Sequence, residues 1–183
     1  MAARPARISD ARGIAGIEVE TWRTTYAGML ADDTLIGMSL VRRQASWAAE
    51  LRRSRAIWVW DEAPSQLLGF GFCGPQRGAS SAYDGEIYML YVLPDAQGRG
   101  IGSSLLEVMR KDLRSAGCRS VLVWVVRGNP ARFFYERMGA KLVLQRQIQD
   151  GAKPVDVLGY GWKDDGQPPG TGRLATRRLN NRR

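Results

Sequence analysis

The chain has 183 residues, of which 44% are hydrophobic and 25% charged, and its 27 basic and 18 acidic residues give a net charge of +9. These values are close to globular averages and the length suits one domain, which excludes a wholly disordered chain, a collagen-like chain and a coiled-coil rod. The sequence has no His and only two Cys, Cys73 and Cys118, which excludes His-based catalytic triads and four-thiolate zinc sites and predicts two reduced thiols.

The positive charge is concentrated near the C-terminal end. Residues 166–183 contain five Arg and no acidic residue, so the rest of the chain is only mildly basic, which suits an anionic ligand without requiring nucleic acid. We expect one domain over residues 1–163 and a disordered Gly/Pro-rich, then Arg-rich, tail over 164–183. No apolar run approaches the ~20 residues of a membrane span, and the first 13 residues do not resemble a secretory signal, so we expect a cytoplasmic protein.

The first half of the chain predicts a strand, helices and then three strands. A short strand is expected at 6–8, a helix from an N-cap at Ser9 to about Tyr26, a further helical turn capped by Asp32 or Asp33, and a helix over 40–51. The strands that follow are expected at 57–60, 66–73 and 86–93.

The second half changes pattern after Pro94. A glycine-containing turn opens a helix that ends near residue 115, and a nearly continuous apolar run at 120–126 is typical of a strand buried on both faces. Asn129-Pro130 predicts the start of a helix that ends near residue 139. Two closing strands are expected at 140–144 and 155–162.

The turn at 97–102 is the strongest candidate for a binding site. Gly98, Gly100 and Gly102 permit positive φ and close approach of a ligand, and the helix that follows presents free N–H groups, which together favour a phosphate group. Arg99 adds positive charge. The run is neither a Walker loop nor a complete G-x-G-x-x-G fingerprint, because the third Gly of that pattern would fall at Ser103.

Two segments resemble the GNAT superfamily of N-acetyltransferases. Residues 92–102 are similar to its acetyl-CoA-binding motif Q/R-x-x-G-x-G/A, filled by Gln97, Gly100 and Gly102. Residues 129–140 are similar to its N-x-x-A/R-x-x-x-Y-x-x-x-G-F segment, with Ala140 in place of the usual aromatic residue. The resemblance implies an α+β fold over residues 4–163. Its sheet would have six or seven mostly antiparallel strands, with a splayed parallel pair at strands four and five, and about four helices would flank it.

The resemblance also implies roles for particular residues. Acetyl-CoA would be the co-substrate, with no metal. The strand at Tyr91, Val92 and Leu93 would pair with its pantetheine arm, and the Val92 N–H would polarise the thioester carbonyl. The remaining cofactor contacts would come from Gln97, Gly98, Arg99, Gly100, Ile101, Gly102, Ser103, Asn129, Arg132 and Tyr135.

Acetyl transfer to an amine also needs proton transfer. Tyr135 occupies the family position that protonates the leaving thiolate, and the alternative role is that of a core aromatic beside Phe133 and Phe134. Glu86 occupies the position of the general-base glutamate in the histone-modifying branch, with a water chain as the alternative. Alternation along a regular strand would put Glu86, Tyr88 and Val92 on one face.

The resemblance also implies candidates for the acceptor site. Trp22 and Tyr26 resemble the helix pair that walls the acceptor pocket in many members, and we add Tyr88 as a third candidate. The expected function is transfer to a primary amine of a small molecule or peptide by a chain that could form a homodimer. The alternatives are a catalytically weak acetyl-CoA-binding regulatory module and a nucleic-acid-binding module that uses the Arg-rich tail. The tail has no aromatic residues to stack on bases, which disfavours nucleic acid.

Overall fold

The computed structural model describes residues 3–54, 56–63, 66–78 and 82–163. The strands of this part of the chain are β1 (Ala3–Pro5), β2 (Ile57–Ala63), β3 (Gln66–Pro75), β4 (Gly85–Val92), β5 (Ser120–Val126), β6 (Lys141–Asp150) and β7 (Lys153–Lys163). Its helices are α1 (Ala11–Thr25), α2 (Asp32–Ile36), α3 (Leu40–Arg53), α4 (Ile101–Ser115) and α5 (Ala131–Arg137), with 3₁₀ turns η1 (Ile8–Asp10) and η2 (Pro94–Ala96).

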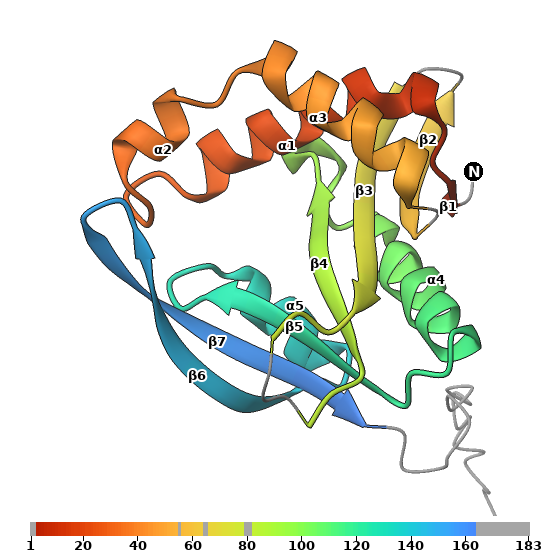
Figure 1. Cartoon of the computed structure of the whole chain (residues 1–183), viewed down its shortest axis with the longest axis vertical. Coiled ribbons are helices and arrows are strands. Elements are labelled where there is room, and N and C mark those ends of the chain that lie inside the picture. The colour runs from red at the N-terminus through yellow and green to blue at the C-terminus, as the bar shows by residue number, and fades with distance from the viewer. Residues whose placement is uncertain (1–2, 55, 64–65, 79–81, 164–183) are drawn as a thin grey trace, which may run out of the picture.

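The strands form one sheet in the order β1-β2-β3-β4-β5-β7-β6, which separates visibly into two parts (Figure 1). Every neighbouring pair is antiparallel except β4 and β5. These two strands are parallel and form only three residue pairs, from Gly85–Val121 to Ile87–Val123. Beyond Ile87 they diverge, so residues 88–92 of β4 have no partner on β5.

Helices cover both faces of the sheet. On one face, α1 and α3 pack on β2, β3 and β4 around Ile14, Trp47 and Phe70. On the other face, α4 packs on β2, β3 and β4 and α5 packs against β7, and a cluster that includes Met109 and Tyr135 joins them. The α4 helix lies very close to the sheet, because a Cβ at Gly71 would come within 2.6 Å of the Met109 side chain.

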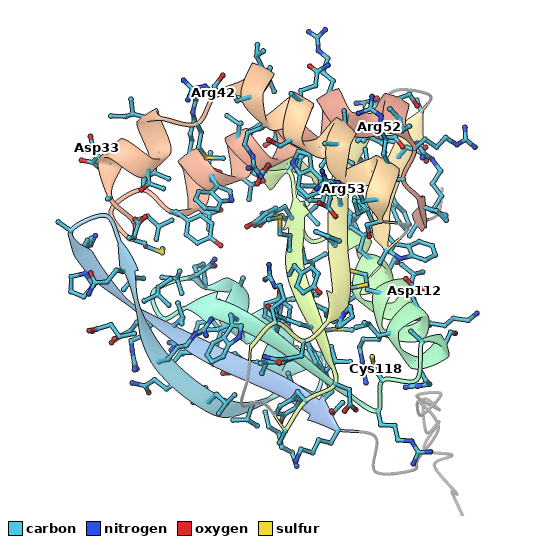
Figure 2. The ribbon with its side chains drawn as sticks, viewed as in Figure 1. Asp33, Arg42, Arg52, Arg53, Asp112 and Cys118 are labelled. Atoms are coloured by element: carbon cyan, nitrogen blue, oxygen red, sulfur yellow. The ribbon has the colours of Figure 1, made fainter. Side chains whose placement is uncertain are left out.

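The charged residues of α3 remain at the surface. Arg42, Arg52 and Arg53 are exposed (Figure 2), while Trp47 of the same helix is buried in the core. The helix therefore has the one apolar face expected of a surface helix.

The fold class predicted from the sequence is confirmed, with five α-helices in the described residues where about four were expected. The predicted strand at 6–8 is wrong: β1 lies earlier, and Ile8–Asp10 is a 3₁₀ turn. The Asp10 carboxylate accepts the Arg7 N–H at 2.7 Å and binds the Arg4 guanidinium at 2.8 Å, which bends the chain there. Ser9 makes no capping bond to α1. The predicted tail at 164–183 lies outside the described residues.

The strand predicted at 140–144 continues to Asp150. Its last six residues, 145–150, are mostly polar, so the sequence shows no strand-like alternation there. The reason is that β6 is an edge strand of the sheet and nine of its ten residues are exposed. Backbone pairing with β7, rather than burial, holds this segment in the sheet.

Candidate active site

The strand β4 presents free backbone N–H groups to the gap beside β5. The Leu93 N–H donates to the Leu68 carbonyl at 2.9 Å, and Val92 lies opposite Gly69. Because N–H directions alternate along an antiparallel strand, the Val92 N–H points away from β3, toward the side where β5 has diverged. An extended ligand could therefore add to β4 as a strand adds to a sheet edge.

The glycine turn links this edge to the N-terminus of α4. Gly98 and Gly100 have φ values of +74° and +80°, a conformation that favours glycine, and no atom would lie within 4 Å of a Cβ added to either. Gly100 is the N-cap of α4, so the first N–H groups of the helix lack intrahelical partners. The Gln97 side chain donates to the Val92 carbonyl at 3.2 Å and ties the turn to the end of β4.

The other residues predicted around this turn have varied surroundings. The Ile101 side chain is buried, so this residue can contact a ligand only through its backbone. The Ser103 hydroxyl donates to the Gly100 carbonyl at 2.9 Å. Arg99 forms an ion pair with Glu62 of β2, which it would have to leave to reach a phosphate. Arg132 lies on α5 with its guanidinium 4.5 Å from the Phe133 ring centre.

A network of polar aromatic side chains spans the gap between β4 and β5. The Trp22 indole N–H donates to the Tyr91 hydroxyl at 3.1 Å. The Tyr26 ring lies 5.3 Å from that of Trp22, and its hydroxyl is close to that of Tyr91 and to the Asn129 side chain. The structure therefore joins the end of α1, the strand β4 and the loop after β5 at one place.

Tyr135 lies close to this network on α5. It is 5% exposed, and its ring contacts Phe134 and Trp162 edge-to-face. Burial first, and the nearby Tyr26 second, raise the pKa of Tyr135 well above its usual value. The hydroxyl therefore keeps its proton through neutral and moderately alkaline pH, as a proton donor requires.

Glu86 and Tyr88 lie in a second cluster. Glu86 is 3% exposed and accepts three hydrogen bonds from Arg77: the backbone N–H at 2.9 Å and two guanidinium N–H groups at 2.8 and 3.3 Å. The Arg77 guanidinium also lies 3.9 Å from the Tyr88 ring centre, and the Tyr88 hydroxyl donates to the Pro75 carbonyl. The contact of Arg77 with Glu86 was not predicted from the sequence, because Arg77 lies in the loop after β3.

The strand β4 is irregular at Tyr88. Phe72 pairs with Met89 and Cys73 with Ile87, so Tyr88 is an extra residue in the ladder. This bulge breaks the alternation that the sequence predicted for residues 86–92. As a result, Ile87 and Leu90 both pack in the core on the α4 side, which a regular strand would not allow.

The tip of the β6–β7 hairpin holds the segment that follows Tyr26. The Asp150 carboxylate accepts the Ala31 N–H at 2.6 Å and the Thr34 hydroxyl at 2.8 Å, and the Lys153 ammonium donates to the Gly28 carbonyl at 3.0 Å. Figure 1 shows this tip beside α2. These contacts fix the end of α1 over the gap between β4 and β5.

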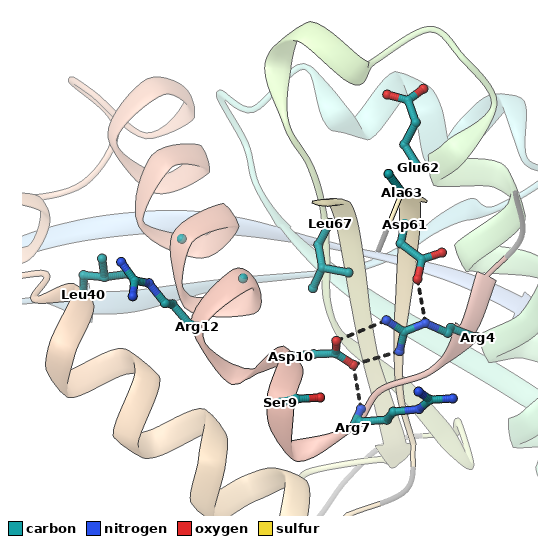
Figure 3. A pocket seen from close by; sticks show the side chains of 12 residues that line it. Arg4, Arg7, Ser9, Asp10, Arg12, Leu40, Asp61, Glu62, Ala63 and Leu67 are labelled. Atoms are coloured by element: carbon teal, nitrogen blue, oxygen red, sulfur yellow. Dashed lines mark hydrogen bonds and ion pairs between the residues drawn. The ribbon is translucent and has the colours of Figure 1, made fainter. Parts of the chain in front are cut away.

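A cavity lies elsewhere, between η1, α1 and the ends of β2 and β3. It has a volume of about 940 Å³, and four of its charged residues, Arg4, Asp10, Asp61 and Glu62, are paired within the protein. Arg4 donates hydrogen bonds to Asp10 and Asp61 on the wall of this cavity (Figure 3). Glu62 forms an ion pair with Arg99. The residues predicted for catalysis do not line this cavity.

Comparisons with known proteins identify the family. Residues 22–140 match the acetyltransferase (GNAT) family. The chain is 30% identical over 161 residues to the uncharacterized N-acetyltransferase YuaI of Bacillus subtilis, covering 88% of this chain and 92% of that protein. It is 26% identical over 140 residues to the L-methionine sulfoximine/L-methionine sulfone acetyltransferase of Pseudomonas paraeruginosa, covering 76% and 79% of the two chains.

A solved structure shows the same fold. The PaiA N-acetyltransferase of Thermoplasma acidophilum, in complex with coenzyme A, superposes with a TM-score of 0.67 at 23% identity, covering 88% of this chain and 97% of that one. The chain belongs to the GNAT family of acetyltransferases, and it is an acyltransferase. No helix in the described part of the chain is long and apolar enough to cross a membrane.

Proposed function

We propose that this protein transfers an acetyl group from acetyl-CoA directly to a primary amine while both substrates are bound. The observation that supports this proposal is the separation of β4 from β5, which leaves the Val92 N–H facing the gap between them. The glycine turn lies at the end of the same strand. One ligand that has an amide-bearing arm and a pyrophosphate would fit both features.

The residues present suit acetyl-CoA, which would supply an activated thioester. The backbone of β4 would pair with the pantetheine arm, and the N–H groups from Gln97 to Ser103 would bind the pyrophosphate. The Val92 N–H would donate to the thioester carbonyl oxygen, where negative charge develops. Asn129 would bind the arm from the opposite side of the gap.

Two residues are assigned to proton transfer. An alkyl amine has a pKa of about 10.4 and must lose a proton before its nitrogen can form a bond to the acyl carbon. Glu86 would accept that proton, directly or through water, once the amine displaces part of its pairing with Arg77. Tyr135 would donate its proton to the sulfur as the carbon–sulfur bond breaks, and its burial keeps that proton available.

The test is release of free thiol across a panel of amines. The purified full chain is mixed with acetyl-CoA and each amine, and thiol release above the amine-free rate identifies an acceptor. The panel includes amino acids and their sulfoximine and sulfone analogues, because one relative carries L-methionine sulfoximine and L-methionine sulfone in its name. Acetyl-CoA binding without amine-dependent release would instead support a regulatory module.

A second arm tests the nucleic-acid alternative. All the proposed site residues lie between Trp22 and Tyr135, so removal of residues 164–183 should leave amine-dependent thiol release unchanged. A truncated chain that keeps acetyl-CoA binding but loses its activity would contradict this and would assign the function to the Arg-rich segment.

A further inference from the structure

Trp124 is the first residue of β5 beyond its ladder with β4, because the last pair of that ladder joins Ile87 to Val123. Its side chain belongs to the same packed cluster as Trp22 and Tyr26. Val123, in contrast, packs in the cluster on the side of α4 and α5. The Trp124 indole therefore lies at the start of the gap, on the face of the sheet that carries the two predicted acceptor-site aromatics.

The indole nitrogen of Trp124 is a buried donor that lacks an acceptor. It is covered from solvent and has no hydrogen-bond partner among the described residues. The benzene end of the indole lies over β7, where a Cβ at Gly159 would be 3.2 and 3.3 Å from Cζ3 and Cη2. Since β7 and β4 flank β5 on opposite sides, the pyrrole end with its N–H lies on the side of the gap. An unpaired buried donor costs free energy, which an acceptor atom of a ligand would recover.

Arg146 brings a positive charge to the same indole. It lies on β6, two strands away from β5, and its guanidinium reaches back to within 4.1 Å of the Trp124 ring centre. The acidic residues of the β6–β7 hairpin are bound elsewhere, Asp150 by the segment that begins α2 and Asp156 by Arg127. In the described part of the chain, Arg146 thus has no acidic partner. Its side chain is exposed and can rotate toward a ligand.

Glu86, the proposed proton acceptor, lies on the same face one step back along the sheet. It pairs with Leu122 in the parallel ladder, so the two side chains share a face. Leu122 and Trp124 are two residues apart on β5, which places them on one face about 6.6 Å apart along the strand. A compact acceptor whose amine faces Glu86 could therefore place a second group at Trp124 and Arg146.

We propose that the acceptor is an amine that also carries a carboxylate, as a free amino acid does, and that the Arg146 guanidinium and the Trp124 N–H bind this carboxylate. The inference rests on the proposed function, because it needs Glu86 to face the amine. Both donors suit one carboxylate, since a guanidinium binds it through two parallel N–H groups or through one and leaves an oxygen for the indole. The cluster around Trp124 favours an apolar substituent, because its buried members are Leu30, Leu35, Val155 and Val157.

The test compares pairs of amines that differ only in the carboxylate: L-leucine with 3-methylbutylamine, and L-phenylalanine with 2-phenylethylamine. Thiol release by the full chain with acetyl-CoA gives kcat/KM for each amine, and calorimetry on the chain saturated with CoA gives the Kd. The two members of a pair differ in their fraction of free amine. The informative quantity is therefore the change that a substitution makes in the ratio of the two kcat/KM values.

Arg146→Gln should lower the preference for the amino acid by at least about 10-fold and raise its Kd by a similar factor, because a charge-assisted contact is lost. Arg146→Lys keeps the charge and should retain part of the preference. Trp124→Phe keeps a ring under the guanidinium and removes the N–H, which should lower the preference about fivefold. The matched control is Arg52→Gln, which removes the same charge at the exposed end of α3 and should keep the wild-type preference (Figure 2).

Each result decides between the carboxylate site and the proposed function. A preference that is the same in Arg146→Gln as in the wild type, or no binding of either amino acid, would overturn the carboxylate site. Thiol release with any other amine would then leave the proposed function intact. Binding of the amino acids that depends on Arg146, without thiol release from any amine, would support the carboxylate site and contradict acetyl transfer.

Discussion

The proposed catalytic role of Tyr135 depends on its hydroxyl alone, because its ring packs in the core. Tyr135→Phe removes the proton donor and keeps the packing against Trp162. We expect kcat to fall by about 10-fold or more with the Kd of acetyl-CoA unchanged, because an interaction made only during bond breaking is lost. Steady-state kinetics and calorimetry on the same preparation check this.

The control for Tyr135→Phe is Tyr160→Phe, which removes a hydroxyl that donates to Glu136 at 2.8 Å from a tyrosine of the same core cluster. It should lower stability somewhat and leave kcat unchanged. Wild-type kcat in Tyr135→Phe would mean that the residue serves packing alone.

The proposed role of Glu86 as a proton acceptor can be tested separately from its ion pair with Arg77. Glu86→Gln keeps the shape of the side chain and removes its ability to accept a proton, so the rate should fall most at low pH, where free amine is scarcest, and recover partly as pH rises. The measurement is the pH dependence of kcat/KM for an identified acceptor. Parallel profiles for variant and wild type would favour a water chain as the base.

Arg77→Gln is the matched variant, because it breaks the same ion pair and keeps the carboxylate. It should preserve the shape of the wild-type pH profile. If Glu86→Gln instead raises KM with little change in kcat, Glu86 serves to bind a cationic acceptor.

At the scale of elements, the role of the glycine turn in binding can be tested separately from the stability of α4. Gly100→Asp places a carboxylate at the N-cap of α4, against the proposed pyrophosphate site, and should weaken acetyl-CoA binding by at least 10-fold. Gly117→Asp makes the same substitution at a glycine with φ +91° and open surroundings at the other end of α4. It carries a similar backbone strain and should leave the Kd unchanged. Equal affinities in the two folded variants would exclude the turn as the pyrophosphate site.

Elements with a strong apolar pattern could be predicted from the sequence. The strand at 120–126 was predicted with the residue limits it has in the structure, because it is apolar throughout and central in the sheet. The helix that starts at Ile101 was predicted equally well from its apolar stripe. Where burial does not select the residues, as along the polar residues 145–150 of the exposed strand β6, the pattern is missing and the strand was predicted too short.

The same distinction applies to the site. The glycine turn and the segment after Asn129 could be found because each is a short local motif. The contact of Asp150 with Ala31 joins residues 119 apart in the sequence, so no local motif indicates it. Glu18 was likewise missed, although it is 1% exposed and binds both Arg43 and Trp47. Its position on α1 has no signal in the sequence beyond its spacing.

For the molecule as a whole, buried acids should limit stability at high pH. Burial raises the pKa of Cys73 to about 12, whereas a thiol in an unfolded chain titrates near 8.5. Because the folded pKa is the higher one, this stabilisation is complete below about pH 8.5 and is lost as pH rises toward 12. The free energy of unfolding should therefore decrease by up to about 1.4 kcal/mol per pH unit from this group alone.

Urea unfolding between pH 8 and 10.5 measures that slope. Cys73→Ala should flatten it, since the thiol that titrates on unfolding is gone. Cys118→Ala should flatten it less, because Cys118 is only partly buried beside the end of α4 (Figure 2). Identical slopes of unfolding free energy against pH in the wild type and in Cys73→Ala would contradict the raised pKa of the Cys73 thiol.

The short ladder between β4 and β5 has a mechanical consequence. With three residue pairs between them, the strands β1–β4 and the strands β5–β7 resemble two leaves joined along a narrow hinge. A strand-like ligand in the gap would act as the missing rungs and cross-link the leaves. Opening of one leaf would then require opening of the other, so amide hydrogens in both halves should exchange with solvent as one cooperative unit when the gap is filled and as two units when it is not.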